Sequence, residues 1–253
     1  MNDRIDIYSF SGTGNTDLMV TRLSEILRGS GKKVIVLPLE KGFKETNENA
    51  DMIGFAFPAS CQAVSPPVWK FFKELPKNKG TKVFVIITMN DSTYILKPLY
   101  RLLKRKGFVP EACVEISMPN NMLTEPIKEN DDRQRISQGY DRITEFANKL
   151  MSGGAEWKEE KKGSGFIGFL SRCTRLPFYF MRMAFMMESD QGKCAKCGLC
   201  VKQCPVGNIS LAEYPVHGSK CALCMRCVAF CPQKAIEIKG KQKVEIRNAN
   251  EIK

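Results

Sequence analysis

Eight cysteines in two matching runs constrain this chain more than any other feature. The first run is KCAKCGLCVKQCP at residues 193–205, and the second is KCALCMRCVAFCP at residues 220–232. The two runs align at a period of 27 residues, and the match extends past the cysteines to Ile209 and Ile236. This agreement indicates an internal duplication of one metal-binding unit.

Each run has the spacing C-x2-C-x2-C-x3-C-P, which is typical of a bacterial [4Fe–4S] site. Three closely spaced thiolates can surround three iron corners of a cubane, and the fourth iron needs a ligand from elsewhere. In units with two clusters, the cysteine before proline binds the other cluster. We therefore assign two crossed ligand sets, which are Cys194, Cys197, Cys200 with Cys231, and Cys221, Cys224, Cys227 with Cys204.

A pair of zinc sites is the main alternative for these eight cysteines. Zinc takes four ligands in a tetrahedron, usually from two separated C-x2-C pairs, and two compact runs that each end in proline fit this poorly. Three further thiols, Cys61, Cys113 and Cys173, would stay free beside the metal-binding runs, which indicates a reducing compartment and not a disulfide framework. No hydrophobic leader precedes the first apolar strand, so we expect a cytoplasmic protein.

The formal net charge of +12 overstates how basic the loaded protein is. A [4Fe–4S] core with four thiolates contributes roughly −2, so two clusters offset about a third of the excess. Residues 151–253 hold 17 Lys or Arg and 9 Asp or Glu, so the excess lies largely where the clusters would bind. A nucleic-acid module would interleave basic residues with stacking aromatics, and the sequence shows none, so we expect no nucleic-acid partner.

Apolar runs alternate with helix-forming segments through residues 1–150. The expected strands are 4–10, 34–37, 52–57, 83–88 and 109–117, and the expected helices are 17–28, 66–75, 94–106 and 131–150. Strands that are nearly continuous in apolar residues argue for a parallel sheet covered on both faces. The expected fold class is α/β, with a doubly wound five-stranded parallel sheet whose ligands bind beyond the carboxyl ends of the strands.

The loop SGTGNT at residues 11–16 joins the first strand to the first helix. Its backbone N–H groups, together with the helix dipole, would bind a phosphate group. No Lys or Arg occurs between Arg4 and Arg22, so the cradle would be neutral. The loop is neither a Walker A motif nor G-x-G-x-x-G. Its place between a strand and a helix favours a phosphate site over an ordinary turn.

The segment YSFSGTGNTDLM resembles the FMN-phosphate loop of flavodoxins, and the five-strand pattern extends this resemblance over residues 1–150. With the two cysteine runs, the chain resembles the flavodoxin–ferredoxin fusion proteins of anaerobes. The resemblance implies a flavodoxin-like domain at 1–151, a linker with an amphipathic segment at 152–190, and a small α+β two-cluster ferredoxin domain at 191–253.

The same resemblance implies an FMN site. Its phosphate contacts would be Ser11, Thr13, Gly14, Asn15 and Thr16. Its ring would lie between the loops 58–65 and 88–94, with candidate contacts Pro58, Ala59, Ser60, Cys61, Met89, Asn90, Asp91 and Tyr94, and Met118-Pro119-Asn120 match a further motif of the fusion family. The loop 58–65 departs from the flavodoxin pattern because it has no aromatic residue to cover the ring, and Tyr94 is the nearest candidate.

Between the two parts, residues 152–165 are rich in glycine and charge, as in a linker. Residues 166–187 are apolar and Met-rich, and at 100° per residue one face holds Phe166, Phe169, Leu170, Cys173, Leu176, Phe180, Ala184 and Met187, opposite Arg172, Arg175 and Arg182. The arginines and Pro177 argue against a transmembrane span. The segment either docks the two parts on each other or lies on a membrane surface.

These features indicate electron transfer. Clusters pass single electrons and FMN stores two, so their combination converts between one- and two-electron chemistry. No nicotinamide fingerprint occurs, so we expect a redox partner protein, such as a ferredoxin or a partner reductase, and an electron carrier rather than a stand-alone oxidoreductase. The alternatives are an FMN-dependent reductase of a quinone, nitro compound or enone fed by its own clusters, and a cluster carrier whose flavodoxin part has lost FMN.

Overall fold

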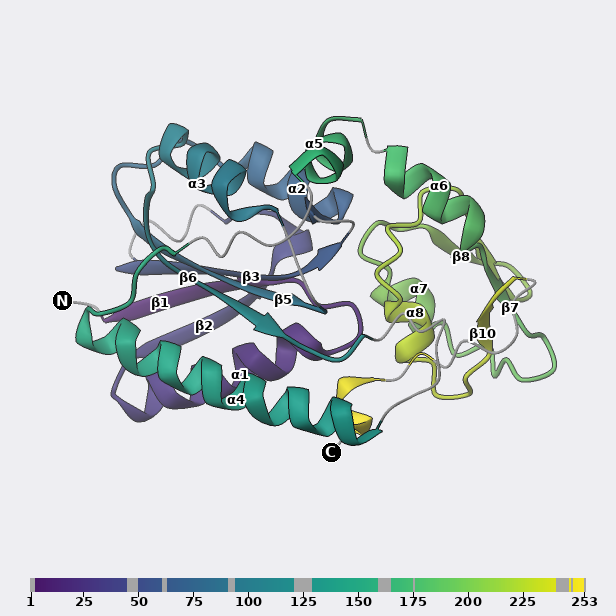
Figure 1. Ribbon diagram of the computed structural model, residues 1–253. Coiled ribbons are helices and arrows are strands. Elements are labelled where there is room, and N and C mark those ends of the chain that lie inside the picture. Colours follow the sequence, from purple (N-terminus) through teal and green to yellow (C-terminus); the bar gives the residue numbers. More distant parts are fainter. Residues whose placement is uncertain are drawn as a thin grey trace.

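The computed structural model describes residues 3–44, 50–60, 63–90, 94–120, 129–158, 165–174, 176–239, 246 and 248–252. The N-terminal part is a sheet covered by helices on both faces. The cysteine-rich part, built of short helices and two-stranded antiparallel sheets, lies beside one end of this sheet (Figure 1).

A parallel sheet forms the centre of the N-terminal part. Its five parallel strands are β1 (Arg4–Ser9), β2 (Lys33–Pro38), β3 (Met52–Ser60), β5 (Lys82–Met89) and β6 (Val109–Ser117). Their spatial order is β2-β1-β3-β5-β6. This is the 2-1-3-4-5 order of the flavodoxin-like fold, whose cofactor site lies at the switch point between the first and third strands. The predicted fold class is confirmed.

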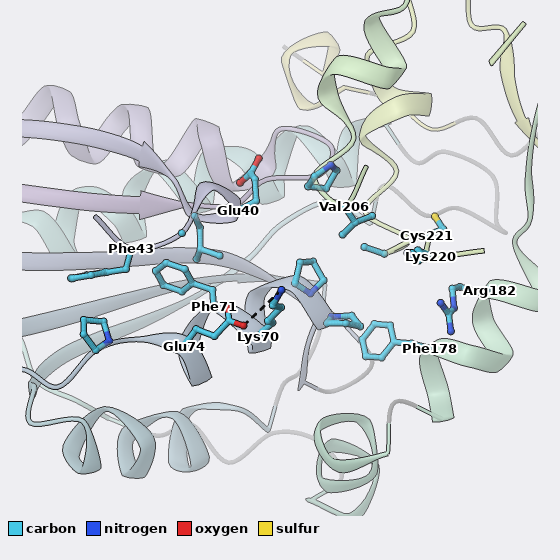
Figure 2. A pocket seen from close by; sticks show the side chains of 17 residues that line it. Glu40, Phe43, Lys70, Phe71, Glu74, Phe178, Arg182, Val206, Lys220 and Cys221 are labelled. Atoms are coloured by element: carbon cyan, nitrogen blue, oxygen red, sulfur yellow. Dashed lines mark ion pairs between the residues drawn. The ribbon is translucent and has the colours of Figure 1, made fainter. Parts of the chain in front are cut away.

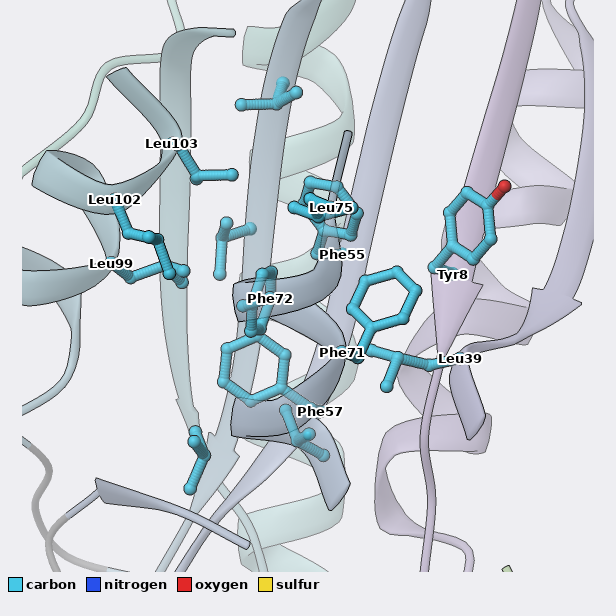
Figure 3. Close-up of a cluster of buried hydrophobic side chains, with 14 of the residues drawn as sticks. Tyr8, Leu39, Phe55, Phe57, Phe71, Phe72, Leu75, Leu99, Leu102 and Leu103 are labelled. Carbon is cyan, nitrogen blue, oxygen red and sulfur yellow. The ribbon is translucent and has the colours of Figure 1, made fainter. Parts of the chain in front are cut away.

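Helices cover the two faces of the sheet in pairs. The helices α1 (Asn15–Gly29) and α4 (Glu129–Ser152) lie on one face, and α2 (Pro66–Glu74) and α3 (Leu96–Arg105) lie on the other (Figure 1). Successive strand residues point to opposite faces, so Ile7 packs in the α1/α4 core and Tyr8 in the α2/α3 core. Figure 3 shows Tyr8 beside Phe71 of α2. Burial on both faces explains the continuous apolar runs.

The strand predicted at 52–57 is longer than expected. It continues to Ser60 and pairs antiparallel with β4 (Ala63–Val64), so much of the predicted loop 58–65 is a hairpin, and residues 61–62 lie outside the described chain. Ser65 stands at the N-cap of α2 but makes no capping hydrogen bond. Its buried hydroxyl has no hydrogen-bond partner among the described residues.

The start of the predicted linker is folded against the first part. The amide of Cys113 donates to the carbonyl of Glu156 at 3.3 Å. The ring of Trp157 meets that of Tyr100 edge-on, with 5.4 Å between centroids, and packs on the core. The packing of one large aromatic side chain therefore keeps this stretch folded on the first part, although its glycine- and charge-rich composition predicted a free linker.

The predicted amphipathic segment is two short helices and not one. The helices are α5 (Gly165–Cys173) and α6 (Leu176–Ala184), followed by β7 (Met187–Ser189). Pro177 lies in the first turn of α6, where proline is tolerated, but it cannot continue a preceding helix. The predicted common face is therefore wrong, because Met187 is buried in a strand while Phe180 is exposed. Within the described chain, no helix has the length and apolarity needed to cross a bilayer.

The cysteine-rich part repeats its backbone at the period of its sequence. It contains α7 (Leu199–Gln203), the hairpin of β8 (Ile209–Leu211) and β9 (Pro215–His217), α8 (Arg226–Ala229), and β10 (Ile236–Ile238), which pairs with β7. The left-handed positions Gly198 and Gly207 recur 27 residues later at Met225 and Lys234. A non-glycine residue costs roughly 1–2 kcal/mol in this conformation, so the duplicated loop geometry is held by its surroundings.

Candidate cofactor-binding site

Hydrogen bonds hold the predicted phosphate loop, residues 11–16, at the carboxyl end of the sheet. Gly14 has a φ of 102° and donates its amide to Ser11 Oγ at 3.2 Å. The hydroxyls of Thr16 and Thr88 lie 2.8 Å apart, which links the loop to the end of β5. Asn15 Nδ2 donates to the carbonyl of Pro119 at 2.9 Å, which links it to the segment after β6. The loop is thus attached to two other strand ends.

A cavity of about 170 Å³ opens beside this loop, at the switch point of the sheet. The residues that line it come from the carboxyl ends of four strands, from Ser65, and from the second cysteine run. They are Phe10, Ser11, Gly12, Thr13, Asn15, Thr16, Pro58, Ala59, Ser60, Ser65, Thr88, Met89, Asn90, Pro119, Asn120, Leu223, Cys224 and Met225. The sheet and the cysteine-rich part therefore share one cavity.

The chemistry of this lining fits the phosphate end of FMN. The first amides of α1, at Asn15 and Thr16, lack intrahelical acceptors and carry the positive end of the helix dipole. Two buried polar atoms on the wall, Asn15 Oδ1 and Ser65 Oγ, have no partner among the described residues. The volume is below the roughly 300–1,000 Å³ usual for a cofactor pocket. The adjoining segments 61–62, 91–93 and 121–128 lie outside the described chain.

Most of the predicted flavin contacts lie together around this cavity. Ser11, Thr13, Asn15, Thr16, Pro58, Ala59, Ser60, Met89 and Asn90 line it, as does the predicted pair Pro119-Asn120. Gly14 shapes the loop behind this lining. The structure does not bring Tyr94 to the cavity, and Cys61 and Asp91 lie outside the described residues.

The eight cysteines gather in the two crossed groups. Cys194, Cys197, Cys200 and Cys231 line one small cavity. In the other group, the thiols of Cys221, Cys224 and Cys227 each interact electrostatically with that of Cys204. Within the described residues, no three His, Cys, Asp or Glu side chains are placed to hold a single metal ion.

The two crossing cysteines have equivalent surroundings. Cys204 Sγ accepts the amide of Asn208 at 3.1 Å, and Cys231 Sγ accepts the amide of Ala235 at 3.3 Å. These two contacts are separated by the 27-residue period of the sequence. Hydrogen bonds to ligand sulfurs are one of the means by which a protein tunes a cluster potential. The duplication therefore reproduces the hydrogen bonding of the sulfur as well as the cysteine spacing.

The loop of the second cysteine run touches the phosphate loop directly. A Cβ added to Gly12 would overlap the carbonyl oxygen of Cys224, so only glycine fits at this approach. Leu223 and Met225 flank this contact, and both are buried. The second cysteine group is thus the one nearer to the predicted flavin site.

Arg226 brings a positive charge to the loop that the sequence predicted to be neutral. Its guanidinium donates twice to the carbonyl of Ser11, from Nε at 3.0 Å and from Nη2 at 2.7 Å. Nη1 donates to Glu40 Oε1 at 2.6 Å, and the group lies 5.3 Å from the centre of the Phe10 ring. Sequence reasoning missed this contact. The one local signal is that the equivalent residue of the first run is Leu199, so the repeat breaks here.

The charge of Arg226 is balanced by two acidic side chains. Glu40, in the short helix η1 (Leu39–Lys41), forms the ion pair and is 13% exposed. Asp17, in the first turn of α1, accepts a hydrogen bond from Ser9 Oγ at 3.4 Å. Desolvation of its carboxylate raises the pKa of Asp17, and the nearby positive charge of Arg226 opposes that rise. The contact between the two parts is therefore a compact polar network around one arginine.

The C-terminal residues return to the same loop. The amide of Ala249, in the short helix η3 (Ala249–Glu251), donates to the carbonyl of Thr13 at 2.8 Å. A Cβ on Gly14 would lie 2.9 Å from Asn248 Oδ1, and Ile252 is buried in the α1/α4 core. The predicted domain at 191–253 contains these residues, but the prediction did not include their contact with the first part. The phosphate loop is thus covered by the second cysteine run and by the C-terminal residues.

A wider groove of about 710 Å³ lies on another side of the same contact. Its walls are η1, α2, α6 and the loop around Cys221 (Figure 2). Lys70 and Glu74 of α2 form an ion pair at 3.7 Å along it, and Phe178 and Arg182 face them from α6. One member of the second cysteine group therefore lies in the wall of a solvent-filled groove.

We predict that Arg226→Met weakens the contact between the two parts. The substitution leaves the Glu40 carboxylate and the Ser11 carbonyl without their donor, and an unsatisfied buried polar group costs about 1–3 kcal/mol. Calorimetry of the loaded protein should show a lower unfolding midpoint. The paired variant Arg226→Met/Glu40→Leu should recover part of the loss, because apolar residues can replace a buried ion pair. An unchanged midpoint for Arg226→Met would contradict the prediction.

Comparisons with known proteins give matches in both parts of the chain. Residues 186–232 match the model of the 4Fe-4S dicluster domain, and a comparison with curated protein sequences gives no match. Among solved structures, the chain is similar to rubredoxin oxygen:oxidoreductase from the anaerobe Desulfovibrio gigas, at 17% identity and a TM-score of 0.41, over 60% of this chain and 37% of that one. It is also similar to the Streptococcus pneumonia TIGR4 flavodoxin, at 18% identity and 0.40, over 56% and 98% of the two chains.

A third similar structure is oxidised Flavodoxin 2 from Bacillus cereus, at 16% identity and a TM-score of 0.44, over 58% of this chain and 99% of that one. These values are low, and the strand order of the sheet carries the assignment of the fold by itself. The chain therefore joins a flavodoxin-like α/β domain to a 4Fe-4S dicluster domain.

Proposed function

We propose that the protein transfers electrons between two [4Fe–4S] clusters and FMN, and exchanges them with a redox partner protein. The observation that carries this proposal is the shared cavity, in which Cys224 and its two neighbours form one wall and the phosphate loop forms another. A ligand of one cluster then lies against the flavin site. Such proximity serves electron transfer within a single chain.

The residues divide into two kinds of cofactor ligand. The crossed cysteine groups would each hold one cubane. Ser11, Thr13 and the first amides of α1 would hold the FMN phosphate, with Asn15 and Ser65 available to further polar groups of the cofactor. FMN, when bound, supplies a two-electron store beside one-electron centres. The protein holds the cofactors at a set separation and keeps water from the contact through Arg226 and the C-terminal residues.

From the positions of the two cysteine groups we infer the order in which electrons pass through the clusters. The group around Cys204 and Cys224 adjoins the flavin site and would be the inner cluster. In the other group, Cys197 is exposed, so this cluster would face the solvent and the partner. Basic side chains flank it, including Lys196 and Lys202, and an acidic surface of a ferredoxin or a partner reductase would complement them. Electrons would pass from the partner through the outer and inner clusters to FMN, or in reverse.

Anaerobic purification tests the proposal directly. We expect about eight irons, about eight sulfides and one FMN per chain, since each cubane holds four irons. Rapid mixing with a reductant should bleach the clusters before the flavin. A Cys194→Ser variant should slow the reduction of the flavin by a protein donor, and Cys173→Ser, on exposed α5, is the matched control. Eight irons without flavin would support the cluster carrier instead.

A second candidate is a reductase of a small molecule. The groove in Figure 2 favours it, because its volume of about 710 Å³ is within the range of ligand pockets and Cys221 lies in its wall. The reduced, isolated protein would then turn over a quinone or a nitro compound without any partner. Steady-state assays with these acceptors separate the two functions, since a pure electron carrier shows no saturable turnover with them.

A further inference from the structure

The helices α5 and α6 present a large apolar surface to solvent, which we call the outer face. It consists of Phe166, Phe169, Leu176, Tyr179, Phe180 and Met183, with exposed fractions of 74%, 56%, 44%, 51%, 64% and 61%. Scattered single apolar residues are normal on a protein surface, but a contiguous patch marks an interaction site. The nine residues of α6 thus supply four large exposed apolar side chains.

The opposite side of the same helices holds them on the protein. Phe178 is 3% exposed, and Met181 and Phe185 pack against the core of the cysteine-rich part. The predicted docking role therefore belongs to this inner side. α6 therefore packs on the cysteine-rich part through its inner side, and the fold leaves the side chains of the outer face exposed to solvent.

The charge of this stretch identifies what covers the outer face. Residues 161–187 contain five Lys or Arg and no Asp or Glu, although the whole chain has 27 acidic residues. Arg182 of α6 is half-buried on the side of the groove, and its Nη1 donates to the carbonyl of Ser219 at 2.9 Å. The stretch therefore combines exposed aromatic and methionine side chains with basic residues and no acidic ones. This combination complements the surface of a lipid bilayer, which has an apolar interior beneath anionic head groups.

We propose that the outer face binds the surface of an anionic lipid bilayer. Amphipathic helices of this kind lie in the plane of the interface, with the apolar side chains buried by roughly 5–10 Å and the basic groups at the lipid phosphates. The two helices bridge the sheet and the cysteine-rich part (Figure 1), so the protein rests on the membrane along the seam between them. This is a surface attachment, and the inference is independent of the proposed electron transfer.

Vesicle co-sedimentation of the loaded, full-length protein tests the proposal. We expect binding to vesicles that contain phosphatidylglycerol, and much weaker binding to pure phosphatidylcholine. Phe180→Glu/Met183→Glu should lower the affinity at least about tenfold, because it places two negative charges on the outer face. Val36→Glu/Met151→Glu, at exposed apolar positions on β2 and α4, is the matched control and should bind as the parent does.

Three results would overturn the proposal. They are equal binding to both kinds of vesicle, no loss of binding in Phe180→Glu/Met183→Glu, or a dimer in solution that this variant dissociates, which would mean that the face pairs two copies. The cluster absorption of each variant reports whether the fold is intact. Where it is lost, Phe166→Ser/Phe169→Ser on α5 lies outside the cysteine-rich part and should give the same loss of vesicle binding.

Discussion

Replacing Cys231 with serine is expected to remove most of the iron from both clusters. Cys231 shares a small cavity with Cys194, Cys197 and Cys200, so the cluster proposed for this group would lose its fourth ligand. The same residue follows α8 directly, and α8 contains Cys227 of the second group. Both runs pack on one small core that includes Met225 and Ile236. Loss of one cubane therefore disorders the helix on which the other depends.

Iron and sulfide assays with low-temperature electron paramagnetic resonance measure this effect. From about eight irons per chain, the content should fall below about four, which is the content of one cubane. Cys204→Ser, in the other cysteine group, should give the same loss of iron, because the surroundings of Cys204 are equivalent to those of Cys231. Cys173→Ser, at an exposed position of α5, is the control and should keep the full content. A Cys231→Ser protein with one intact cluster would refute the mutual dependence.

Gly12→Ala is expected to separate the flavin site from the inner cluster. The new Cβ would overlap the carbonyl oxygen of Cys224, and the collision is with main-chain atoms, so no rotamer change relieves it. Overpacking of this kind costs about 1–3 kcal/mol. The chain reduces that cost by moving the loop 223–225 away from the phosphate loop. The cavity wall that this loop provides then opens to water.

Stopped-flow reduction of the flavin through the clusters measures the consequence. We expect the flavin to be reduced more slowly than in the parent, because the inner cluster and the flavin site would lie farther apart. Cluster reduction itself should be unchanged. Gly29→Ala, at the last residue of α1 with no other atom near the new Cβ, is the matched control. A Gly12→Ala protein that keeps the parent rate would show that the close approach is unimportant for electron transfer.

The parts of the fold that follow local rules could be predicted from the sequence. Strands buried on both faces appear as apolar runs, so the five parallel strands and their helices were located to within a few residues. The phosphate loop depends on neighbouring residues between one strand and one helix, and the structure places it at the switch point as expected. The cysteine spacing likewise predicted which thiols gather.

Contacts between distant segments could not be predicted in this way. Arg226 lies 215 residues from Ser11, and nothing local to either residue indicates that they meet. Trp157 folds a stretch that composition assigned to a linker, because a single large side chain outweighs its polar neighbours. On α6, periodicity identified apolar positions but not which of them the rest of the protein covers. Burial depends on tertiary packing, which a single helix does not encode.

The hydrogen bond from Ala249 to Thr13 has a consequence for biosynthesis. Ribosomes make the phosphate loop before the two cysteine runs, and they make Ala249 after both of them. The sheet can therefore fold while translation continues, but its cofactor loop gains this cover only once the later segment has been made. Flavin captured early would be held by an unfinished site. Full retention of flavin would then report that the segment around Ala249 has been made and has docked on the loop.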